Sequence, residues 1–350
     1  MCSSDLVAVL IGAMFFMDAI EQLIDVQFNR AERQDATLSF YEAKGPQALN
    51  AARALPGVLY AEPFRAVSAR LHFGGASRRE SVTGVVADAR LSQILDDTLQ
   101  PVAIPPHGLV LSDKLAEMLG ANLGDVVQVE VTEGRRPQLA LPVVQVSKTL
   151  LGSPAYVDFD YLSTLLAEGG HISGVRVKLD RRLEDAFFTA VKNTPGIAGV
   201  TVKRTTLSAF RNTMAENILL MTTFNVFFAG VIAVGVVYNS ARISLSARAR
   251  ELASLRVLGF TLGEVSYVLL GELAALTLFA LPWGWALGYG LAKIWTVSLD
   301  TDLYRLPLVV APATYGFATS VVVMAGLLSG LLVFHRIKGL DLVGALKTRE

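Results

Sequence analysis

Three long stretches without a single charged residue constrain what this chain can fold into. They are residues 217–241, 273–292 and 306–334, and each reaches the ~20 mostly apolar residues that a helix needs to cross a bilayer. Of the whole chain, 52% of residues are hydrophobic and 18% are charged, whereas a soluble globular chain carries about 25% charged residues. Buried helices of a large soluble protein are the alternative, which three such runs disfavour. The sequence therefore predicts three membrane-spanning helices in its C-terminal part.

A fourth apolar run lies near the start of the chain, over residues 6–17, but its twelve residues are too few to span a bilayer. Nothing basic precedes it and no small-residue cleavage site follows, so a signal peptide is not indicated. We interpret it as the outer part of a truncated first spanning helix, because Ile20, Leu23, Ile24 and Phe28 continue a helical spacing beyond it. The opening letters, MCSSDL, resemble non-native sequence.

Lysine and arginine residues near the spans indicate the orientation, because short cytoplasmic loops carry an excess of them. They gather in the loop after the second span and in the C-terminal tail: Arg242, Arg248, Arg250, Arg256, Arg336, Lys338, Lys347 and Arg349. The loop between the last two spans has as many acidic as basic residues. We therefore expect residues 242–264 and the tail in the cytoplasm, and the region from about 27 to 214 outside.

The predicted outer region has the patterns of an α+β domain. Two of its segments, ALNAARALPGVLYAEPFRAV and AFFTAVKNTPGIAGVTVKRT, both run helix, Pro-Gly turn, strand, and each follows a further predicted strand. This echo predicts two βαβ units split by a small β insert at about 105–150; chance recurrence of Pro-Gly is the alternative. Strands are expected over 35–42, 59–73, 80–87, 126–133, 139–147, 173–180 and 199–205, and helices over 45–55, 112–120 and 182–193, with Ser112 as an N-cap.

Motifs for catalysis or metal binding are missing from the sequence. It contains no Gly-x-x-x-x-Gly-Lys-Ser/Thr, no Gly-x-Gly-x-x-Gly after a strand and no Gly-x-Ser-x-Gly. The four histidines and the single cysteine have no partners at ligand spacing: His72, His107, His171, His335 and Cys2. We therefore expect no catalytic residue, no metal and no cofactor in this chain. A net charge of zero gives no argument for nucleic-acid binding.

One acidic and aromatic cluster, Tyr156, Asp158, Asp160 and Tyr161, invites a catalytic interpretation. A surface turn is favoured over a catalytic carboxylate pair, because nothing else nearby suits such chemistry.

The predicted spans carry residues that suit helix packing in lipid. Gly284 and Gly288 form a Gly-x-x-x-Gly pattern, as do Gly326 and Gly330, and small residues at this spacing allow helix backbones to approach closely. The general abundance of glycine in membrane helices is the alternative. Pro282 is expected to kink the third span. Glu272 is either an interfacial residue or a polar contact inside the helix bundle.

The segment SARARELASLRVLGFTLGEV, residues 246–265, is charged, helix-forming and placed between two predicted spans. Wound as a helix it has two apolar stripes, one of leucines and one of Ala249, Ala253, Val257 and Phe260. A helix lying passively on a membrane needs one apolar face. We therefore expect this one to contact both the spanning helices and a cytoplasmic partner; an interfacial helix without a special role is the alternative.

This segment resembles the Arg-x-Arg-Glu-Leu/Ile-x-x-Leu-Arg-x-Leu-Gly motif of the FtsX/MacB-type ABC transporter permeases. The closing IKGLDLVGALKTRE is similar to the family's Asp-Pro-x-Glu-Ala-Leu-Arg tail, from which Val343 and Gly344 depart. The resemblance implies a bacterial cytoplasmic-membrane permease with four spans and a MacB-like outer domain, similar to the second half of a longer permease. The residues it implies for contact with an ATPase are Arg248, Arg250, Glu251, Leu252, Leu255, Arg256, Leu258, Gly259 and Phe260.

The resemblance also implies partners and a function. A separate ABC ATPase, in two copies holding ATP and Mg²⁺, would drive this chain paired with a second permease half or a second copy, and a periplasmic or extracellular protein could join them. The expected function is export or extraction of a lipoprotein, lipid, peptide or hydrophobic compound. An FtsX-like signalling subunit that activates a cell-wall hydrolase and a scaffold without ATPase coupling are the alternatives.

The expected division of the chain follows from these assignments. It consists of a first transmembrane helix (1–26), an extracytoplasmic domain (27–214), a second transmembrane helix (215–241), a coupling helix (242–264), a third transmembrane helix (265–296), an outer loop (297–312), a fourth transmembrane helix (313–334) and a tail (335–350).

Overall fold

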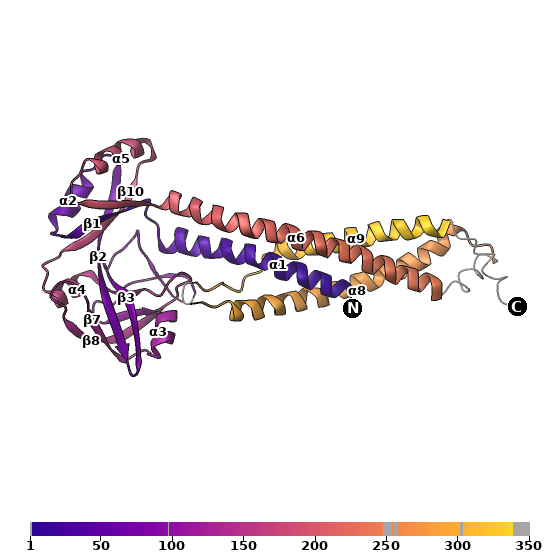
Figure 1. Ribbon diagram of the computed structural model, residues 1–350, viewed down its shortest axis with the longest axis horizontal. Helices are drawn as coiled ribbons and strands as arrows, with labels where there is room; N and C mark the ends of the chain where they lie inside the picture. Colours follow the sequence, from indigo (N-terminus) through magenta and orange to yellow (C-terminus); the bar gives the residue numbers. More distant parts are fainter. Residues whose placement is uncertain (1, 97, 248–253, 255–257, 302–303, 339–350) are drawn as a thin grey trace. The chain divides into compact units, whose positions relative to one another are not determined.

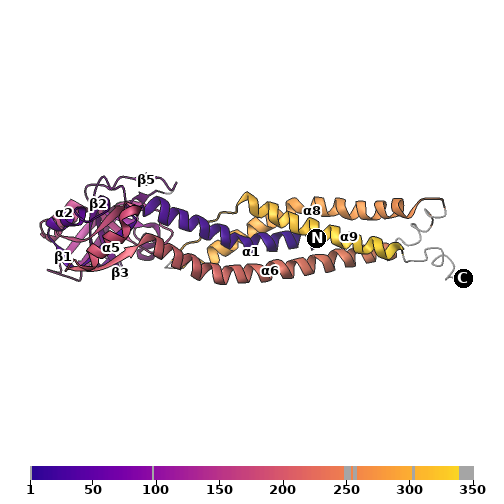
Figure 2. The same ribbon diagram turned by 90° about the horizontal axis from the view of Figure 1, so that it is seen from above.

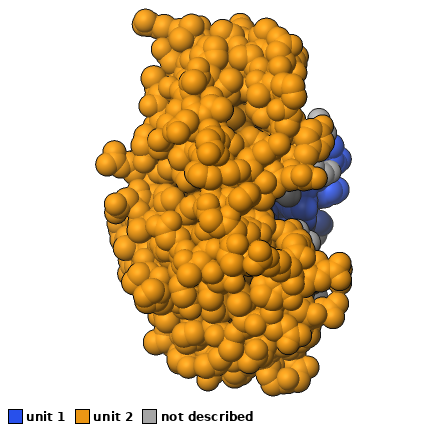
Figure 3. Space-filling view, turned by 90° about the vertical axis from the view of Figure 1, so that its left-hand side faces the viewer, with its two compact units in different colours: residues 1–20, 214–299, 308–350 blue, residues 21–213, 300–307 orange. Residues whose placement is uncertain are grey.

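The computed structural model describes residues 2–96, 98–247, 254, 258–301 and 304–338. The chain divides into two compact units, coloured separately in Figure 3. The helical unit comprises residues 1–20, 214–299 and 308–350, and the sheet unit comprises residues 21–213 and 300–307. The chain therefore passes between the units four times, and two of these passages lie inside helices.

The first half of the sheet unit is a four-stranded antiparallel sheet with two helices. Its strands are in the order β11-β1-β10-β2, so that each βαβ piece places one strand between the two strands of the other. Its elements are β1 (Ala36–Lys44), α2 (Gln47–Arg53), β2 (Val58–Phe73), β10 (Ile172–Leu179), α5 (Glu184–Lys192) and β11 (Ile197–Val202). Side chains of both helices, including Ala52 and Phe187, join one buried cluster with the strands. The predicted split βαβ arrangement is confirmed.

The second half of the sheet unit is a closed ring of strands, and β2 belongs to both halves (Figure 1). Beyond the first sheet β2 pairs with β3 and β7, and the pairs β3–β9, β9–β6, β6–β8 and β8–β7 complete the ring. The elements added here are β3 (Ala76–Val85), β6 (Leu109–Ser112), α3 (Asp113–Leu119), β7 (Val126–Val131), β8 (Gln138–Ser147), β9 (Ala155–Asp158) and α4 (Phe159–Leu166). A short ladder of β4 (Ile94–Leu95) and β5 (Pro101–Val102) lies beside the ring.

Burial follows the period of two that strands impose. In β7 the buried residues Val127, Val129 and Val131 alternate with more exposed ones and point into the ring. Leu115 of α3 and Leu162 of α4 are fully buried in the same cluster, so the two short helices close the ring's interior.

The insert is larger than the 105–150 expected from sequence, because the ring also takes in β3, β9 and α4. The surface turn expected around Asp158 and Asp160 is wrong. Asp158 is buried and caps α4, where its Oδ1 accepts hydrogen bonds from the backbone N–H groups of Asp160 and Tyr161, at 3.1 and 3.0 Å. The predicted N-cap at Ser112 is confirmed, since its Oγ accepts from the backbone N–H of Leu115 at 3.3 Å.

The helical unit is built from long helices that run alongside one another in Figures 1 and 2. They are α1 (Cys2–Ile24), α6 (Lys203–Ala247), α8 (Leu262–Ser298) and α9 (Pro312–Lys338), and α1 passes directly into a π-helix, η1 (Asp25–Ala31). Buried residues of α1, among them Val7 and Ile11, pack with residues of the other three.

Two helical segments among the described residues are long and apolar enough to cross a membrane, Ser4–Ala31 and Ala274–Ser298. The apolar stretches Leu220–Val236 of α6 and Pro312–Leu328 of α9 are shorter. The four-span arrangement therefore stays a prediction. The helices α6, α8 and α9 all extend beyond the spans expected at 215–241, 265–296 and 313–334.

Candidate functional site

In the helical unit, α1 and α8 approach each other closely at Gly284 and Gly288. A Cβ added to Gly284 would lie 2.7 Å from the Cβ of Val7, and one added to Gly288 would lie 2.8 Å from the Cβ of Ile11. These distances leave no room for a side chain larger than glycine. Gly284 and Gly288 are four residues apart and therefore lie on the same face of α8, and α1 packs against this face.

The glycines of α9 have a different environment. A Cβ at Gly326 would have no described atom within 4 Å, and Gly330 lies partly buried in the same helix. Pro282 lies inside α8, which continues on both sides of it. Glu272 is also inside α8 and is partly buried. Its two interpretations, interfacial or facing the bundle, both stay open.

A polar contact that sequence reasoning missed joins α1 to α9. One carboxylate oxygen of Asp18 accepts hydrogen bonds from the backbone N–H of Ala311, at 2.8 Å, and from Oγ1 of Thr314, at 2.7 Å. Asp18 thereby supplies the N-terminal cap of α9 from another helix. The available signal was a carboxylate at the end of an apolar run, which gives no indication of its partner.

The connection from α6 to α8 contains the predicted ATPase contacts. Arg248, Arg250, Glu251, Leu252, Leu255 and Arg256 lie outside the described residues. Of the others, Leu258 is 74% exposed and Phe260 is 45% exposed. Gly259 has φ +97°, a left-handed conformation that favours glycine. It directly follows a helix-type hydrogen bond, in which Leu258 N donates to Ser254 O.

A capping box begins α8 immediately after this turn. The backbone N–H of Thr261 donates to the Glu264 carboxylate at 2.7 Å, and the backbone N–H of Glu264 donates to Thr261 Oγ1 at 3.3 Å. The reciprocal bonds satisfy helix-end N–H groups. In the described part of the connection, the turn at Gly259 is therefore followed directly by the start of α8, and the side chains of Leu258 and Phe260 are exposed.

The segment between α8 and α9 is held on the sheet unit by Arg305. Its guanidinium contacts three carboxylates: Asp113 at 2.9 Å, Asp300 at 3.2 Å and Glu117. The backbone N–H of Arg305 also donates to the carbonyl of Leu150 at 3.0 Å. Burial alone would lower the pKa of Arg305, but Asp113, Asp300 and Glu117 together raise it above its ordinary value. We call these four ionised side chains the Arg305 clamp.

A second ion-pair cluster joins the two halves of the sheet unit. Arg65 on β2 is buried and donates to both carboxylate oxygens of Glu168, at 2.8 and 2.9 Å. It also pairs with Glu133 at 2.9 Å and donates to Ser173 Oγ at 2.9 Å. A buried guanidinium satisfied on all sides indicates a structural role.

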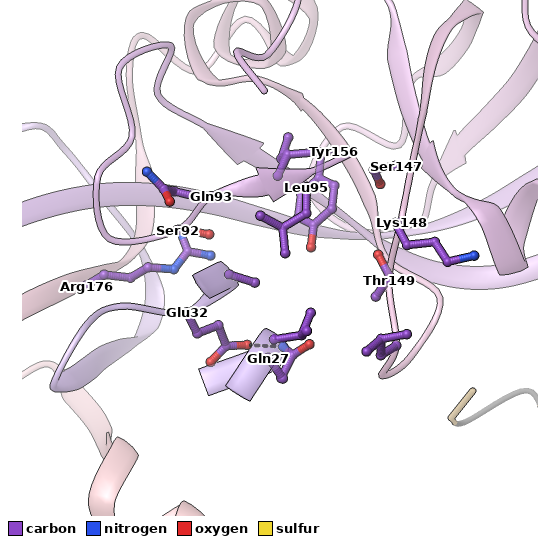
Figure 4. A pocket seen from close by; sticks show the side chains of 14 residues that line it. Gln27, Glu32, Ser92, Gln93, Leu95, Ser147, Lys148, Thr149, Tyr156 and Arg176 are labelled. Carbon is purple, nitrogen blue, oxygen red and sulfur yellow. Dashed lines mark hydrogen bonds between the residues drawn. The ribbon is translucent and has the colours of Figure 1, made fainter. Parts of the chain in front are cut away.

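A cavity of about 70 Å³ is lined by η1, by the segment that leads into β4, and by residues of β8, β9 and β10 (Figure 4). Backbone hydrogen bonds connect η1 to that segment: Arg33 N donates to Leu91 O at 2.7 Å, and Gln93 N donates to Ala31 O at 2.8 Å. The side chains labelled there are Gln27, Glu32, Ser92, Gln93, Leu95, Ser147, Lys148, Thr149, Tyr156 and Arg176. We call this the Arg176 cavity.

Two ionisable groups of this cavity are shifted by burial. The pKa of Tyr156 is raised to about 12, mainly because burial disfavours the phenolate. Burial likewise lowers the pKa of Arg176, against the opposite effects of Tyr156, Glu32 and Glu62. The Tyr156 hydroxyl is therefore protonated at neutral pH and able to donate. The sequence marked Tyr156 as part of an acidic and aromatic cluster but gave no signal for Arg176 or for their shared cavity, because the two residues come from separate strands, β9 and β10.

Comparison with known proteins gives a family match in the C-terminal part. Residues 223–342 match the family described as FtsX-like permease C-terminal. This confirms over those residues the resemblance to FtsX-type permeases, whose motif lies within the match. A search of curated proteins finds no match.

Three solved structures are similar to part of the chain. The extracellular domain of the noncanonic ABC-type transporter YknZ from Gram-positive bacteria has 16% identity and a TM-score of 0.32, covering 49% of this chain and 99% of that domain. The periplasmic region of MacB from Actinobacillus actinomycetemcomitans has 13% identity and a TM-score of 0.35, covering 53% and 95%. A domain of a putative permease protein from Porphyromonas gingivalis has 11% identity and a TM-score of 0.27, covering 45% and 78%.

Proposed function

We propose that this chain, whose residues 223–342 match the FtsX-like permease C-terminal family, is the permease subunit of an ABC transporter. That match carries the proposal, because it includes most of α6, the connection after it, α8 and α9. ATP and Mg²⁺ would bind to a separate ATPase, in two copies, and this chain would pair with a second permease half or a second copy of itself. The membrane is the bacterial cytoplasmic membrane, with the sheet unit outside and the C-terminus inside.

The ATPase would bind the connection between α6 and α8. Leu258 and Phe260 support this assignment, because large apolar side chains exposed on one turn are typical of a protein contact. Arg248, Arg250, Glu251 and Arg256 would add polar contacts around them. Gly259 and the capping box of α8 define where the connection ends.

Movement of the helices would reach the sheet unit through the chain itself. Two of the four passages between the units lie within α1 and α6, so each of these helices has residues in both units. The other two flank residues 300–307, which the Arg305 clamp holds to α3. This provides a mechanical route for ATP-driven motion without a central pore.

The substrate class that we propose is a lipoprotein, lipid, peptide or hydrophobic compound taken up at the outer face. The closed ring and its helices favour this function, because they add a second folded half to the sheet unit beyond what a simple anchor needs. A signalling subunit that activates a cell-wall hydrolase is the second candidate. A hydrolase that binds the sheet unit would favour it.

The test is co-purification of the full chain with the ABC ATPase encoded beside its gene, followed by measurement of ATP turnover. The variant Leu255→Asp/Leu258→Asp should lose both the complex and the stimulation of turnover. The matched control is Leu59→Asp/Leu123→Asp, which places the same charges at two leucines that are 67% and 68% exposed on the sheet unit. If the native chain neither binds nor stimulates the ATPase, a scaffold without coupling becomes the better assignment.

A further inference from the structure

The Arg176 cavity contains a guanidinium without a polar partner. One face of the Arg176 guanidinium lies 4.5 Å from the centre of the Phe64 ring. Among the described residues, none accepts a hydrogen bond from its side chain and none forms an ion pair with it within 4.0 Å. Arginine has five N–H donors, and the Arg176 side chain is partly buried. These donors therefore face the cavity and its water without a protein acceptor among the described residues.

A carboxylate of opposite charge lines the same cavity without contacting Arg176. Glu32 accepts hydrogen bonds from Nε2 of Gln27, at 2.9 Å, and from Nε2 of Gln34, at 3.2 Å. A carboxylate has about four acceptor positions, so two bonds leave Glu32 with capacity for a further donor. Figure 4 shows the hydrogen bond between Gln27 and Glu32, and Arg176 and Ser92 line the same cavity.

The other charged groups near this cavity are already paired. Lys148 forms an ion pair with Asp113 at 3.1 Å, and in Figure 4 its ammonium points away from Arg176. The carboxylate of Glu62 accepts from the backbone N–H groups of Arg90 and Leu91. The cavity thus presents one unpaired cation and one carboxylate with spare acceptor capacity.

We propose that the Arg176 cavity binds a small zwitterion of the α-amino acid type, with its carboxylate on Arg176 and its ammonium on Glu32. Arginine's planar fork suits a carboxylate because two parallel N–H donors can bond both oxygens. The hydroxyls of Ser92 and Tyr156 line the cavity as additional donors to the carboxylate.

Charge and volume narrow the class of ligand. The Glu32 carboxylate would repel a simple anion, and the Arg176 guanidinium would repel a simple cation. A zwitterion can pair with both groups. One water needs about 10–15 Å³ of such space, so a cavity of about 70 Å³ admits roughly five water-sized groups. Glycine has about that many non-hydrogen atoms, which makes glycine and L-alanine the fitting probes.

The cavity lies against the π-helix that follows α1, so a bound ligand would contact this part of the chain. Val26, Gln27 and Ala31 of the π-helix line it, and π-helical turns are frequent at functional sites. A ligand there would contact η1 and the sheet unit's strands at once. Binding requires no ATPase, so its test is independent of the proposed transport function.

The experiment is isothermal titration of the full chain in detergent, in a buffer without amines or carboxylates, using glycine, L-alanine, acetate and methylamine. Glycine or L-alanine should bind at least about tenfold more tightly than acetate or methylamine. The variants Arg176→Gln and Glu32→Gln should each weaken binding by about tenfold or more. Arg90→Gln, which removes an exposed arginine outside the cavity lining, is the control and should leave binding unchanged.

The probes decide the outcome even where a variant fails to fold, because the native chain alone distinguishes the ligand classes. Equal affinity for glycine and acetate would exclude a role for Glu32 and overturn the zwitterion assignment. Absence of heat with all four probes would also overturn it, since the cavity would then hold water only.

Discussion

Removing the Arg305 guanidinium should loosen the contact between Arg305 and the rest of the sheet unit. The side chain of Arg305 is 22% exposed, and its partner Asp113 is 14% exposed. An exposed ion pair contributes about 0–1 kcal/mol, and breaking a buried one costs about 3–5 kcal/mol. The exposed fractions of Arg305 and Asp113 lie between those of an exposed pair and a buried pair. Arg305→Met should therefore lower the free energy of local opening by about 2 kcal/mol.

Amide hydrogen exchange is the suitable assay, because it reports local opening rather than global unfolding. Since 1.4 kcal/mol corresponds to about a factor of ten, exchange at the Arg305 N–H should rise about 30-fold. This amide is the donor to the Leu150 carbonyl. The matched control is Arg204→Met, which breaks an ion pair with Glu184 elsewhere in the sheet unit and should leave residues 300–307 unchanged.

A double-mutant cycle separates the clamp from general destabilisation. Asp113→Asn should raise exchange in the native background and have a smaller effect once Arg305 has been replaced, because the interaction that it removes is already gone. Unchanged exchange in Arg305→Met would refute the clamp, and fully additive effects would show that Asp113 acts through another partner, such as Lys148.

Three further predictions concern packing, titration and capping. Gly288→Leu should destabilise the α1–α8 contact by about 1–3 kcal/mol because a Cβ there would meet Ile11, whereas Gly326→Leu should change thermal stability little; equal effects would contradict the packing role. Burial raises the pKa of Tyr156 from 10.0 to about 12, so the unfolded chain loses this proton first as pH rises. The free energy of unfolding should therefore be constant below pH ~10 and fall by about 1.4 kcal/mol per pH unit up to about pH 12. In alkaline denaturation, Tyr156→Phe should remove this slope. Asp18→Ala should cost about 1 kcal/mol by uncapping α9, measured as a lower melting temperature, and Asp18→Asn should recover part of it.

Much of the first half of the sheet unit was predictable because its signals are local. The Pro-Gly turns and the helices before them lie within short segments, and α2, α5 and their strands overlap the predicted ranges, although the strand expected over 199–205 ends at Val202, where α6 follows. Ser112 was identifiable as an N-cap because its bond reaches only to Leu115. Such features depend on a few consecutive residues, whose conformational preferences act before any tertiary contact forms.

The ring was only partly predictable because its closure depends on distant pairings. β6 and β9 have four residues each, too few to show a period, and α4 follows β9 without a loop. The pairing of β2 with β7 joins Ala69 to Val131, across a separation that no local pattern encodes. The acidic cluster at Asp158 was misassigned for the same reason, since the helix that it caps was not recognised.

The candidate sites divide in the same way. Their residue types were visible in the sequence at Gly284 and Gly288 and in the segment before α8, because glycine spacing, charge and apolar stripes are properties of one helix. The Arg305 clamp, the Asp18 cap and the Arg176 cavity were not, because each brings together groups from separate elements.

The sequence by itself determined that apolar helices accompany an α+β region, because hydrophobic length and periodicity are summed along the chain and need no partner. It also determined the resemblance to a permease, through one charged motif between two apolar runs. Only the tertiary structure decided that the strands close into a ring, that α8 rests on α1 at two glycines, and which charges are paired. The physical reason is that ion pairing and close packing act over a few ångströms in space, between residues whose distance along the chain sets no limit on their approach.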